Sequence, residues 1–169
     1  MSVILSHIVA TSLNNVIGFK GKLPWHIPKD LKYFFTKTKN KVLIMGRKSF
    51  DSLESKPLPN RLNLVLTHRK SFLEKSFLDK NLLFFSHFKK ALKYAQQPEI
   101  LEKYGNEIFI AGGGEIYKQT LLQMDRLYVT RIYKEYKGDA FYPEIPEKYF
   151  KLTKQEDHKG FSFLVYEKN

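Results

Sequence analysis

The sequence predicts an α/β fold in which helices cover both faces of a central sheet. Short apolar runs alternate with segments of helical spacing, several of the apolar runs end at glycine or basic residues, and two strand-like segments flank Lys159-Gly160 near the C-terminus. We therefore expect a single domain over residues 1–169, with a mixed, mostly parallel twisted sheet of about eight strands, a C-terminal antiparallel hairpin and about four flanking helices.

The first half of the chain opens on an apolar run. Val3–Ala10 has the continuous apolar character of a buried central strand, and the asparagines and glycines of Thr11–His26 predict a loop. Pro28 suits the first turn of a helix that Lys29–Thr38 continues. The elements expected next are a strand at Val42–Met45 ending at Gly46, a short helix at Arg47–Leu53, a proline-rich turn at Ser55–Asn60 and a strand at Leu62–Thr67.

The second half repeats this alternation. A strand is expected at Leu82–Phe85, and Phe88–Tyr104 has helical spacing that Pro98 interrupts. Glu107–Ala111 is expected to be a strand that runs into three glycines, followed by a helix to Leu122. The chain is expected to close with strands at Arg126–Tyr133, Lys151–Asp157 and Phe161–Glu167.

The composition bounds the function. A hydrophobic content of 43% is typical of a globular protein rather than a disordered one. The absence of cysteine excludes a disulfide framework and thiolate chemistry. No apolar run approaches the roughly 20 residues of a transmembrane helix, and the N-terminus lacks the basic region and cleavage site of a signal peptide. We expect a soluble cytoplasmic protein, monomeric and without a metal site.

The formal net charge of +12 raises the alternative of a nucleic-acid-binding module. The lysines, however, are spread over the whole chain and alternate with apolar residues, which is the pattern of solvated faces. The same charge would attract a small polyanionic ligand.

Asp30 is the only carboxylate among the first fifty residues. It lies four residues before Phe34, so the two share a helix face, and Leu31 flanks that face. By itself, the sequence around Asp30 is compatible with a residue stabilising the helix start, a salt-bridge partner, or the polar anchor of an apolar pocket.

Three predicted strand ends carry glycine or basic residues. They are Gly112-Gly113-Gly114, Arg47-Lys48-Ser49 after Gly46, and Thr67-His68-Arg69. The carboxyl ends of parallel strands meet at one edge of a sheet, where ligands bind. Free amides at a helix start attract phosphate, so the three ends together indicate a ligand with several phosphates.

Nine short segments match a known pattern in order and in near-constant spacing. They are Ile8-Val9-Ala10, Asn15-Val16-Ile17-Gly18, Leu23-Pro24-Trp25, Pro28-x-Asp30-Leu31-x-x-Phe34, Ile44-Met45-Gly46-Arg47-x-Ser49, Pro57-Leu58-Pro59-x-Arg61, Ala111-Gly112-Gly113-x-x-Ile116-Tyr117, Leu127-x-x-Thr130 and Gly138-Asp139. Together they resemble the dihydrofolate reductase family, and the match runs from Val3 to about Val165.

The resemblance implies NADPH-dependent reduction of 7,8-dihydrofolate to 5,6,7,8-tetrahydrofolate, by hydride transfer from nicotinamide C4 to pterin C6. It further implies a role in one-carbon metabolism and sensitivity to antifolate inhibitors. Asp30 would accept hydrogen bonds from the 2-amino group and N3 of the pterin ring. A water near Leu23 would protonate N5, with Trp25 and Thr130 holding the hydrogen-bond network. The implied catalytic residues are therefore Asp30, Leu23, Trp25 and Thr130.

The resemblance also implies the two binding surfaces, with Arg61 gripping the α-carboxylate of the substrate's glutamate and Lys56 at the pocket rim. The expected substrate-binding residues are Ile8, Val9, Ala10, Asp30, Leu31, Phe34, Leu53, Lys56, Leu58, Arg61, Ala111, Tyr117 and Thr130. The expected cofactor-binding residues are Ala10, Ile17, Gly18, Gly21, Gly46, Arg47, Lys48, Ser49, Leu66, Thr67, His68, Arg69, Ala111, Gly112, Gly113, Gly114, Glu115, Ile116 and Tyr117.

Two features stay open. A related-fold pyrimidine reductase of riboflavin biosynthesis would share the nicotinamide site, although Asp30, Phe34 and Arg61 together favour the folate reading. Glu115 departs from the pattern, because an acid beside the glycines would repel phosphate unless its side chain points to solvent.

Overall fold

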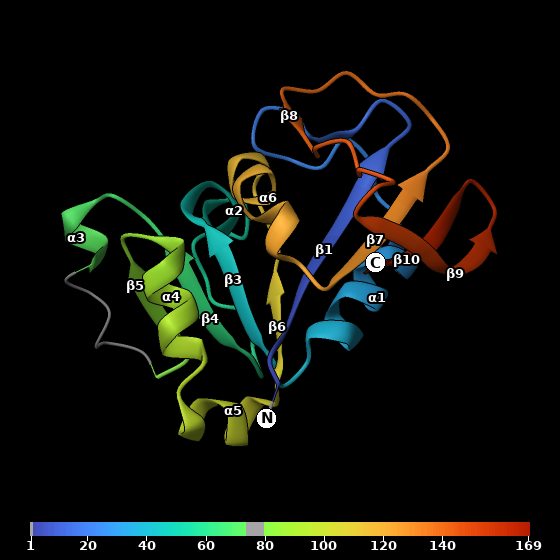
Figure 1. Cartoon of the computed structure of the whole chain (residues 1–169). Coiled ribbons are helices and arrows are strands. Elements are labelled where there is room, and N and C mark those ends of the chain that lie inside the picture. The colour runs from blue at the N-terminus through green and yellow to red at the C-terminus, as the bar shows by residue number, and fades with distance from the viewer. Residues whose placement is uncertain (1, 74–79) are drawn as a thin grey trace.

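The computed structural model describes residues 2–73 and 80–169, and its centre is a twisted sheet of eight strands (Figure 1). The strands run in the order β5-β4-β3-β6-β1-β7-β10-β9. Their bounds are β1 Ile4–Ser12, β3 Val42–Gly46, β4 Leu62–Leu66, β5 Leu82–Phe85, β6 Glu107–Ile110, β7 Arg126–Ile132, β9 Phe150–His158 and β10 Phe161–Lys168.

The sheet is parallel from β5 through to β7 and antiparallel beyond it, where β10 pairs with β7 and β9 pairs with β10. The predicted mixed sheet with a C-terminal hairpin is confirmed. The central strands are apolar because both of their faces are covered, and every residue of β3 is buried. The carboxyl ends of β1, β3, β4 and β6 consequently meet at one edge of the sheet.

Helices pack on both faces. Their bounds are α1 Pro28–Thr38, α2 Arg47–Asp51, α3 Lys70–Leu73, α4 Phe88–Ala95, α5 Pro98–Tyr104 and α6 Gly114–Thr120, followed by the short 3₁₀ helix η1 at Leu121–Gln123. The described residues thus contain six α-helices where about four are expected. Pro98 separates α4 from α5 because the residue before a proline is driven into an extended conformation, here Gln97 at ψ 140°.

Two apolar layers divide the core. Side chains of α1 and α2 pack with Leu43, Met45 and Phe109 on one face of the sheet, and side chains of α4 and α6 pack with Ile44 and Ile110 on the other. Neighbouring residues of one strand thus serve opposite layers, as the two-residue repeat of a strand requires. This arrangement fixes α1 beside the ends of β1 and β7.

The expected loop at Thr11–His26 contains a short strand, β2 (Val16–Gly18), which pairs with β8 (Ala140–Phe141). A segment of three residues is too short to show a periodic pattern. Gly138 permits the pairing, because a Cβ at that position would lie 2.2 Å from Cγ1 of Val16. The amide of Asp139 donates to the carbonyl of Gly18 at 3.0 Å and completes the contact.

In the part of the chain that the structure describes, no helix is long and apolar enough to cross a membrane.

Candidate active site

The contact between Asp30 and Thr130 anchors one end of the site. Asp30 lies in the first turn of α1, and Thr130 lies in β7, in register with Ala10 of β1. The hydroxyl of buried Thr130 donates to Oδ1 of Asp30 at 2.6 Å. Among the described residues, Asp30 makes no ion pair within 4.0 Å, and its side chain forms no cap at the start of α1. Asp30 is therefore a half-buried carboxylate with one neutral side-chain donor among the described residues.

Burial is the main influence on the Asp30 carboxyl. It raises the pKa of Asp30 above its ordinary value, because the charged form loses hydration, and the hydrogen bond from Thr130 works in the opposite direction. Among the described residues, only Oδ1 accepts a side-chain hydrogen bond, so a ligand with two donors in a row could use the remaining acceptor capacity of the group. A buried acid of this kind is the usual polar anchor of an apolar pocket.

The predicted apolar walls come together beside Asp30. Ile8, Phe34, Leu53, Leu58 and Ala111 belong to one packed cluster. Val9 points the other way and packs in the opposite layer, so only its backbone lies on this side of the sheet. Leu31 and Leu23 are 37% and 51% exposed, which is consistent with positions on a pocket rim.

Trp25 supplies a buried polar atom without a partner. Its ring packs edge-on against Tyr136 at 5.2 Å between centroids and joins the cluster that includes Ala10. Nε1 of Trp25 is buried and makes no hydrogen bond to any described residue. A buried donor in this condition is costly and is normally satisfied by water or a ligand.

Arg61 forms the other end of the site. It is 5% exposed, and Nε donates to Oγ1 of Thr38 at 2.8 Å while Nη2 donates to the carbonyl of Phe35 at 2.7 Å. Nη1 donates to the carbonyl of Pro59. A guanidinium has five N–H groups, so two remain. No carboxylate of the described residues lies within 4.0 Å of Arg61, and burial lowers its pKa.

A surface depression lies directly beside Arg61. It has a volume of about 540 Å³ and is lined by residues of α1 and the turn before β4: Lys32, Phe35, Thr36, Lys39, Asn60 and Arg61. The ring of Phe35 lies 5.4 Å from the guanidinium carbon. The lining carries cations and no acid, so it suits an anionic group attached to an apolar body.

The glycines after β6 form a cradle of backbone groups, which the sequence predicts as a phosphate site. The Gly112–Gly113 peptide bond is cis, and Gly112 has φ +100°, a conformation that favours glycine. The Gly46 amide donates to the carbonyl of Gly112 at 2.7 Å, which places the start of α2 beside the start of α6. Neither helix start has a side-chain cap, and Ser49 Oγ lies 3.4 Å from where a Cβ of Gly113 would be. Uncapped amides at two helix starts fit a pyrophosphate.

Basic groups surround this cradle at the neighbouring strand ends. Arg47 is held by Asp51 at 2.6 Å, and Lys48 and Arg69 are exposed. The ring of His68 lies 6.0 Å from that of His87. Thr67 is buried, with Oγ1 accepting from the amide of Arg69, while Leu66 and Ile116 pack on the apolar layer below.

Several of the predicted site residues lie at the edges of the clusters described above. Tyr117 is buried and its hydroxyl donates to the carbonyl of Ile8 at 2.7 Å, so it supports the site from beneath. Lys56 is exposed, with Glu54 at 3.8 Å. Glu115 is exposed, so its side chain reaches solvent, and Gly21 is also exposed, with open space where a side chain would begin. Ile17 reaches Gly114, at 3.9 Å from where a Cβ would stand, and Gly18 pairs with β8.

The sequence did not predict a buried chain of hydrogen bonds under the glycine cradle, which we call the polar relay. Thr120 Oγ1 donates to the carbonyl of Ile116 at 2.6 Å, so it accepts from Nε2 of His7 at 2.8 Å. Nδ1 of His7 therefore accepts from the hydroxyl of Tyr142 at 2.8 Å. The relay joins β1, α6 and the segment after β8. The signal in the sequence was a histidine inside a mostly apolar strand.

Comparisons with known proteins agree with this geometry. The family model described as dihydrofolate reductase matches residues 4–168. Dihydrofolate reductase of Bacillus subtilis is 38% identical over 171 aligned positions, covering 97% of this chain and 94% of the relative. That of Haemophilus influenzae is 40% identical over 140 positions, covering 83% and 79%. The solved structure of dihydrofolate reductase from Enterococcus faecalis, complexed with NADP(H) and RAB-propyl, superposes with a TM-score of 0.81 at 32% identity, covering 98% and 96%.

Proposed function

This chain belongs to the dihydrofolate reductase family, and from that premise we propose how its own residues carry out the NADPH-dependent reduction of 7,8-dihydrofolate to 5,6,7,8-tetrahydrofolate. The observation that carries the proposal is that α1 joins two complementary anchors. Asp30 lies in its first turn, and Phe35 and Thr38 near its end hold Arg61. At a rise of about 1.5 Å per residue, the anchors are roughly 10 Å apart along the helix.

The two anchors differ in sign, and an apolar wall lies between them. A carboxylate suits the paired donors of the pterin ring, an unpaired guanidinium suits the glutamate carboxylate, and the Phe34 cluster suits the benzoyl group between them. Dihydrofolate carries these three features in this order. A pyrimidine reductase would have no use for a buried arginine without a carboxylate partner among the described residues, so Arg61 favours dihydrofolate.

Asp30 works as an orienting anion. Its carboxylate accepts from the 2-amino group and N3 of the pterin, while Thr130 fixes the direction of Oδ1. Two charge-assisted bonds hold the ring in one plane, and a reactant held in one plane loses little further freedom on the way to the transition state. Trp25 Nε1 is buried and has no hydrogen-bond partner among the described residues, so it is placed to hold the water that delivers a proton to N5, with Leu23 at the rim controlling its entry.

On the cofactor side, different groups of residues bind different parts of NADPH. Bound NADPH supplies the hydride. The uncapped amides after Gly46 and Gly113 bind the pyrophosphate, and Arg47, Lys48, His68 and Arg69 bind the ribose 2′-phosphate. Gly18 pairs with β8, and Ile17 lies against Gly114. Both residues belong to the loop that excludes water from the reacting rings.

The complete set of anchors lies within one chain, so we also propose that the protein acts as a monomer in the cytoplasm and that antifolates compete at the Asp30 end. Sedimentation of the purified protein tests the first point. Competition with dihydrofolate tests the last.

The experiment for the function is a comparison of cofactors in the presence and absence of dihydrofolate. We expect dihydrofolate-dependent oxidation of NADPH, and much slower oxidation of NADH at equal concentration. A protein that oxidises neither cofactor when dihydrofolate is added would contradict the proposal, and equal rates with both would contradict the assigned 2′-phosphate site.

A further inference from the structure

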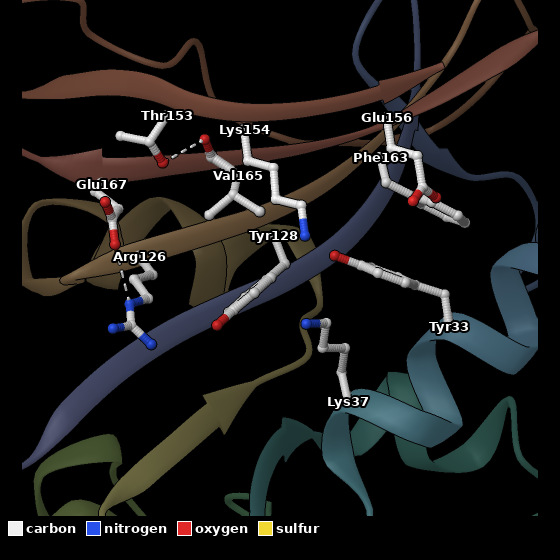
Figure 2. A pocket seen from close by; sticks show the side chains of 10 residues that line it. All are labelled: Tyr33, Lys37, Arg126, Tyr128, Thr153, Lys154, Glu156, Phe163, Val165 and Glu167. Atoms are coloured by element: carbon white, nitrogen blue, oxygen red, sulfur yellow. Dashed lines mark hydrogen bonds and ion pairs between the residues drawn. The ribbon is translucent and has the colours of Figure 1, made fainter. Parts of the chain in front are cut away.

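A second pocket lies on the other flank of α1, between that helix and the antiparallel edge of the sheet (Figure 2). It has a volume of about 260 Å³ and is lined by side chains of α1, β7, β9 and β10. We call it the α1–β9 pocket and define it by Tyr33, Lys37, Tyr128, Lys154, Glu156 and Phe163. It shares no lining residue with the depression beside Arg61.

The walls of the α1–β9 pocket are aromatic. Tyr33 stacks on Phe163, with ring centroids 4.0 Å apart and planes at 12°. The ammonium group of Lys37 lies 5.6 Å from the ring centroid of Tyr33 and 5.3 Å from that of Tyr128, so it lies near both rings. In Figure 2, the ends of Lys37, Lys154 and Tyr33 point toward the same space. Flat apolar surface and hydrogen-bond donors therefore meet in one cavity.

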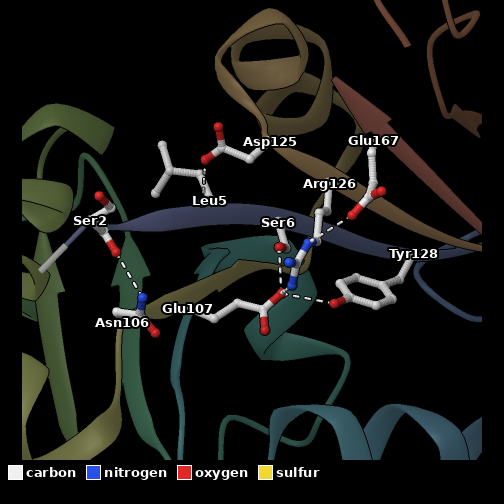
Figure 3. Close-up of polar contacts among 9 residues, drawn as sticks. All are labelled: Ser2, Leu5, Ser6, Asn106, Glu107, Asp125, Arg126, Tyr128 and Glu167. Atoms are coloured by element: carbon white, nitrogen blue, oxygen red, sulfur yellow. Dashed lines mark hydrogen bonds and ion pairs between the residues drawn. The ribbon is translucent and has the colours of Figure 1, made fainter. Parts of the chain in front are cut away.

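The acids at the border are already paired. Glu156 bonds to His158 at 2.7 Å, and Glu167 lies 3.3 Å from Nε of Arg126. Behind them, Glu107 accepts from Ser6 at 2.8 Å and from Tyr128 at 2.9 Å (Figure 3). These contacts fix the directions of the carboxylates. Arg126 offsets part of the charge of Glu107 and Glu167, whereas Glu156 keeps its negative charge at the border of the pocket.

The two lysines are not paired in this way. Within residues 2–73 and 80–169, neither Lys37 nor Lys154 has a carboxylate oxygen within 4.0 Å. Lys37 is half-buried, so its charge is only partly screened by solvent. Lys37 therefore favours an anion in the cavity. The charge of exposed Lys154 is partly offset by Glu156, whose pKa is lowered by the hydrogen bond with His158 and by the charge of Lys154. Glu156 and Glu167 also disfavour a second negative charge on the ligand.

The size of the cavity narrows the ligand further. At about 30 Å³ per water molecule in the liquid, 260 Å³ corresponds to roughly nine waters. That space suits a single aromatic ring with one small substituent rather than a nucleotide or a peptide.

We propose that the α1–β9 pocket is a binding site for a small planar aromatic monocarboxylate, with the carboxylate between Lys37 and Lys154 and the ring against Tyr33 and Tyr128. A ligand there contacts α1 one helical turn from Asp30 and β7 two residues from Thr130. The site is separate from the one that takes dihydrofolate, and its occupation does not depend on the proposed reaction.

Benzoate is the probe, and the protein is titrated with saturating folate present so that the depression beside Arg61 is blocked. Amide NMR spectra are expected to show saturable shifts for Tyr33, Tyr128 and Phe163. Benzamide, which has the same shape without the charge, is expected to bind at least about 5-fold more weakly, corresponding to the loss of about 1 kcal/mol of ionic attraction.

Charge variants test the position of the carboxylate. Lys37→Gln and Lys154→Gln are each expected to weaken benzoate binding by about 5-fold or more. Lys159→Gln, in the exposed turn between β9 and β10, removes the same charge outside the pocket and is expected to leave binding unchanged. Thermal unfolding of each variant verifies that it is folded.

The outcomes are distinct. Absence of saturable shifts, shifts confined to other parts of the chain, or wild-type affinity in both pocket variants would overturn the proposal. Equal loss in Lys159→Gln would also overturn it, because the binding would then follow net charge rather than the pocket. A failure of the protein to reduce dihydrofolate would leave the benzoate result unaffected.

Discussion

The hydroxyl of Thr130 donates to Oδ1 of Asp30 at 2.6 Å and links two residues that lie 100 positions apart in the chain. The bond ties the first turn of α1 to β7 and, within the described part of the chain, is the one side-chain contact that opposes the effect of burial on the Asp30 carboxyl. It therefore directs Oδ1 and favours the ionised form of the group that is proposed to orient the pterin, against the larger effect of burial.

Removal of this bond should impair catalysis through Asp30. Thr130→Val keeps the shape but leaves Asp30 without its donor, so the pKa of Asp30 should rise further above its ordinary value. Because the ionised form is the one that binds, dihydrofolate affinity should fall by roughly 10- to 100-fold, with the largest loss at low pH. Thr130→Ser, which keeps the donor, should stay near wild type. The Asp30 pKa from carbon NMR and kcat/KM against pH measure both effects, and unchanged profiles in Thr130→Val would count against the role.

Arg61 should matter only for substrates with a glutamate tail. Arg61→Leu removes the proposed partner of the tail carboxylate, so KM for dihydrofolate should rise on the order of 10²-fold. Dihydropteroate, which lacks the glutamate, should lose no more than about 5-fold. This matched substrate separates lost recognition from general damage, since the broken bonds to Thr38 and Phe35 affect both substrates. An equal rise in KM for both substrates would show that Arg61 has a purely structural role.

Arg47 should contribute to cofactor preference. Its guanidinium is fixed by Asp51 at the start of α2, beside the glycine cradle. Arg47→Ala should lower kcat/KM for NADPH by on the order of 10-fold with little effect on NADH, which narrows the ratio between them. Lys118→Ala, an exposed charge loss on α6, is the control and should leave the ratio unchanged. A wild-type ratio in Arg47→Ala would place 2′-phosphate recognition elsewhere.

His7 should make the fold sensitive to acid. Burial lowers the pKa of His7 from 6.5 to about 3, so the unfolded chain binds this proton between those values and the folded protein does not. Stability contributed by neutral His7 is therefore complete above about pH 6.5 and is lost as pH falls, by at most about 1.4 kcal/mol per pH unit. His7→Gln should show a smaller loss than wild type over that range. Urea unfolding at several pH values measures it, and parallel curves for the two proteins would contradict the buried neutral imidazole.

The mostly parallel sheet and its C-terminal hairpin could be predicted from the sequence, whereas the order of the strands in the sheet was not predicted. β1, β3, β4 and β6 are apolar runs ending at polar or glycine residues, and their parallel pairing is what such runs favour. The pairing of β2 with β8 could not be predicted from the sequence, because it depends on the absence of a side chain at Gly138 and on carbonyl groups of a loop.

Some features of the site could likewise be predicted from the sequence, and others could not. The helix face that Asp30 shares with Phe34 could be predicted from helical spacing. The family resemblance placed Thr130 in the hydrogen-bond network of the site, and the structure adds its bond to Asp30. The three bonds that hold Arg61 against α1 could not be predicted, since two of them end on carbonyl oxygens whose positions no residue type encodes. The opposite orientations of Ile8 and Val9 follow from strand geometry once β1 is recognised.

The most direct measurement of the central claim is the single-turnover rate of dihydrofolate reduction by Asp30→Asn with saturating NADPH. Asparagine keeps an oxygen that can accept from Thr130 and removes the charge, so the variant should fold with undiminished thermal stability. We expect a rate lower by on the order of 10²-fold or more, because one acceptor for the pterin becomes a donor. A folded Asp30→Asn protein that reduces dihydrofolate at nearly the wild-type rate would contradict the orienting role of Asp30.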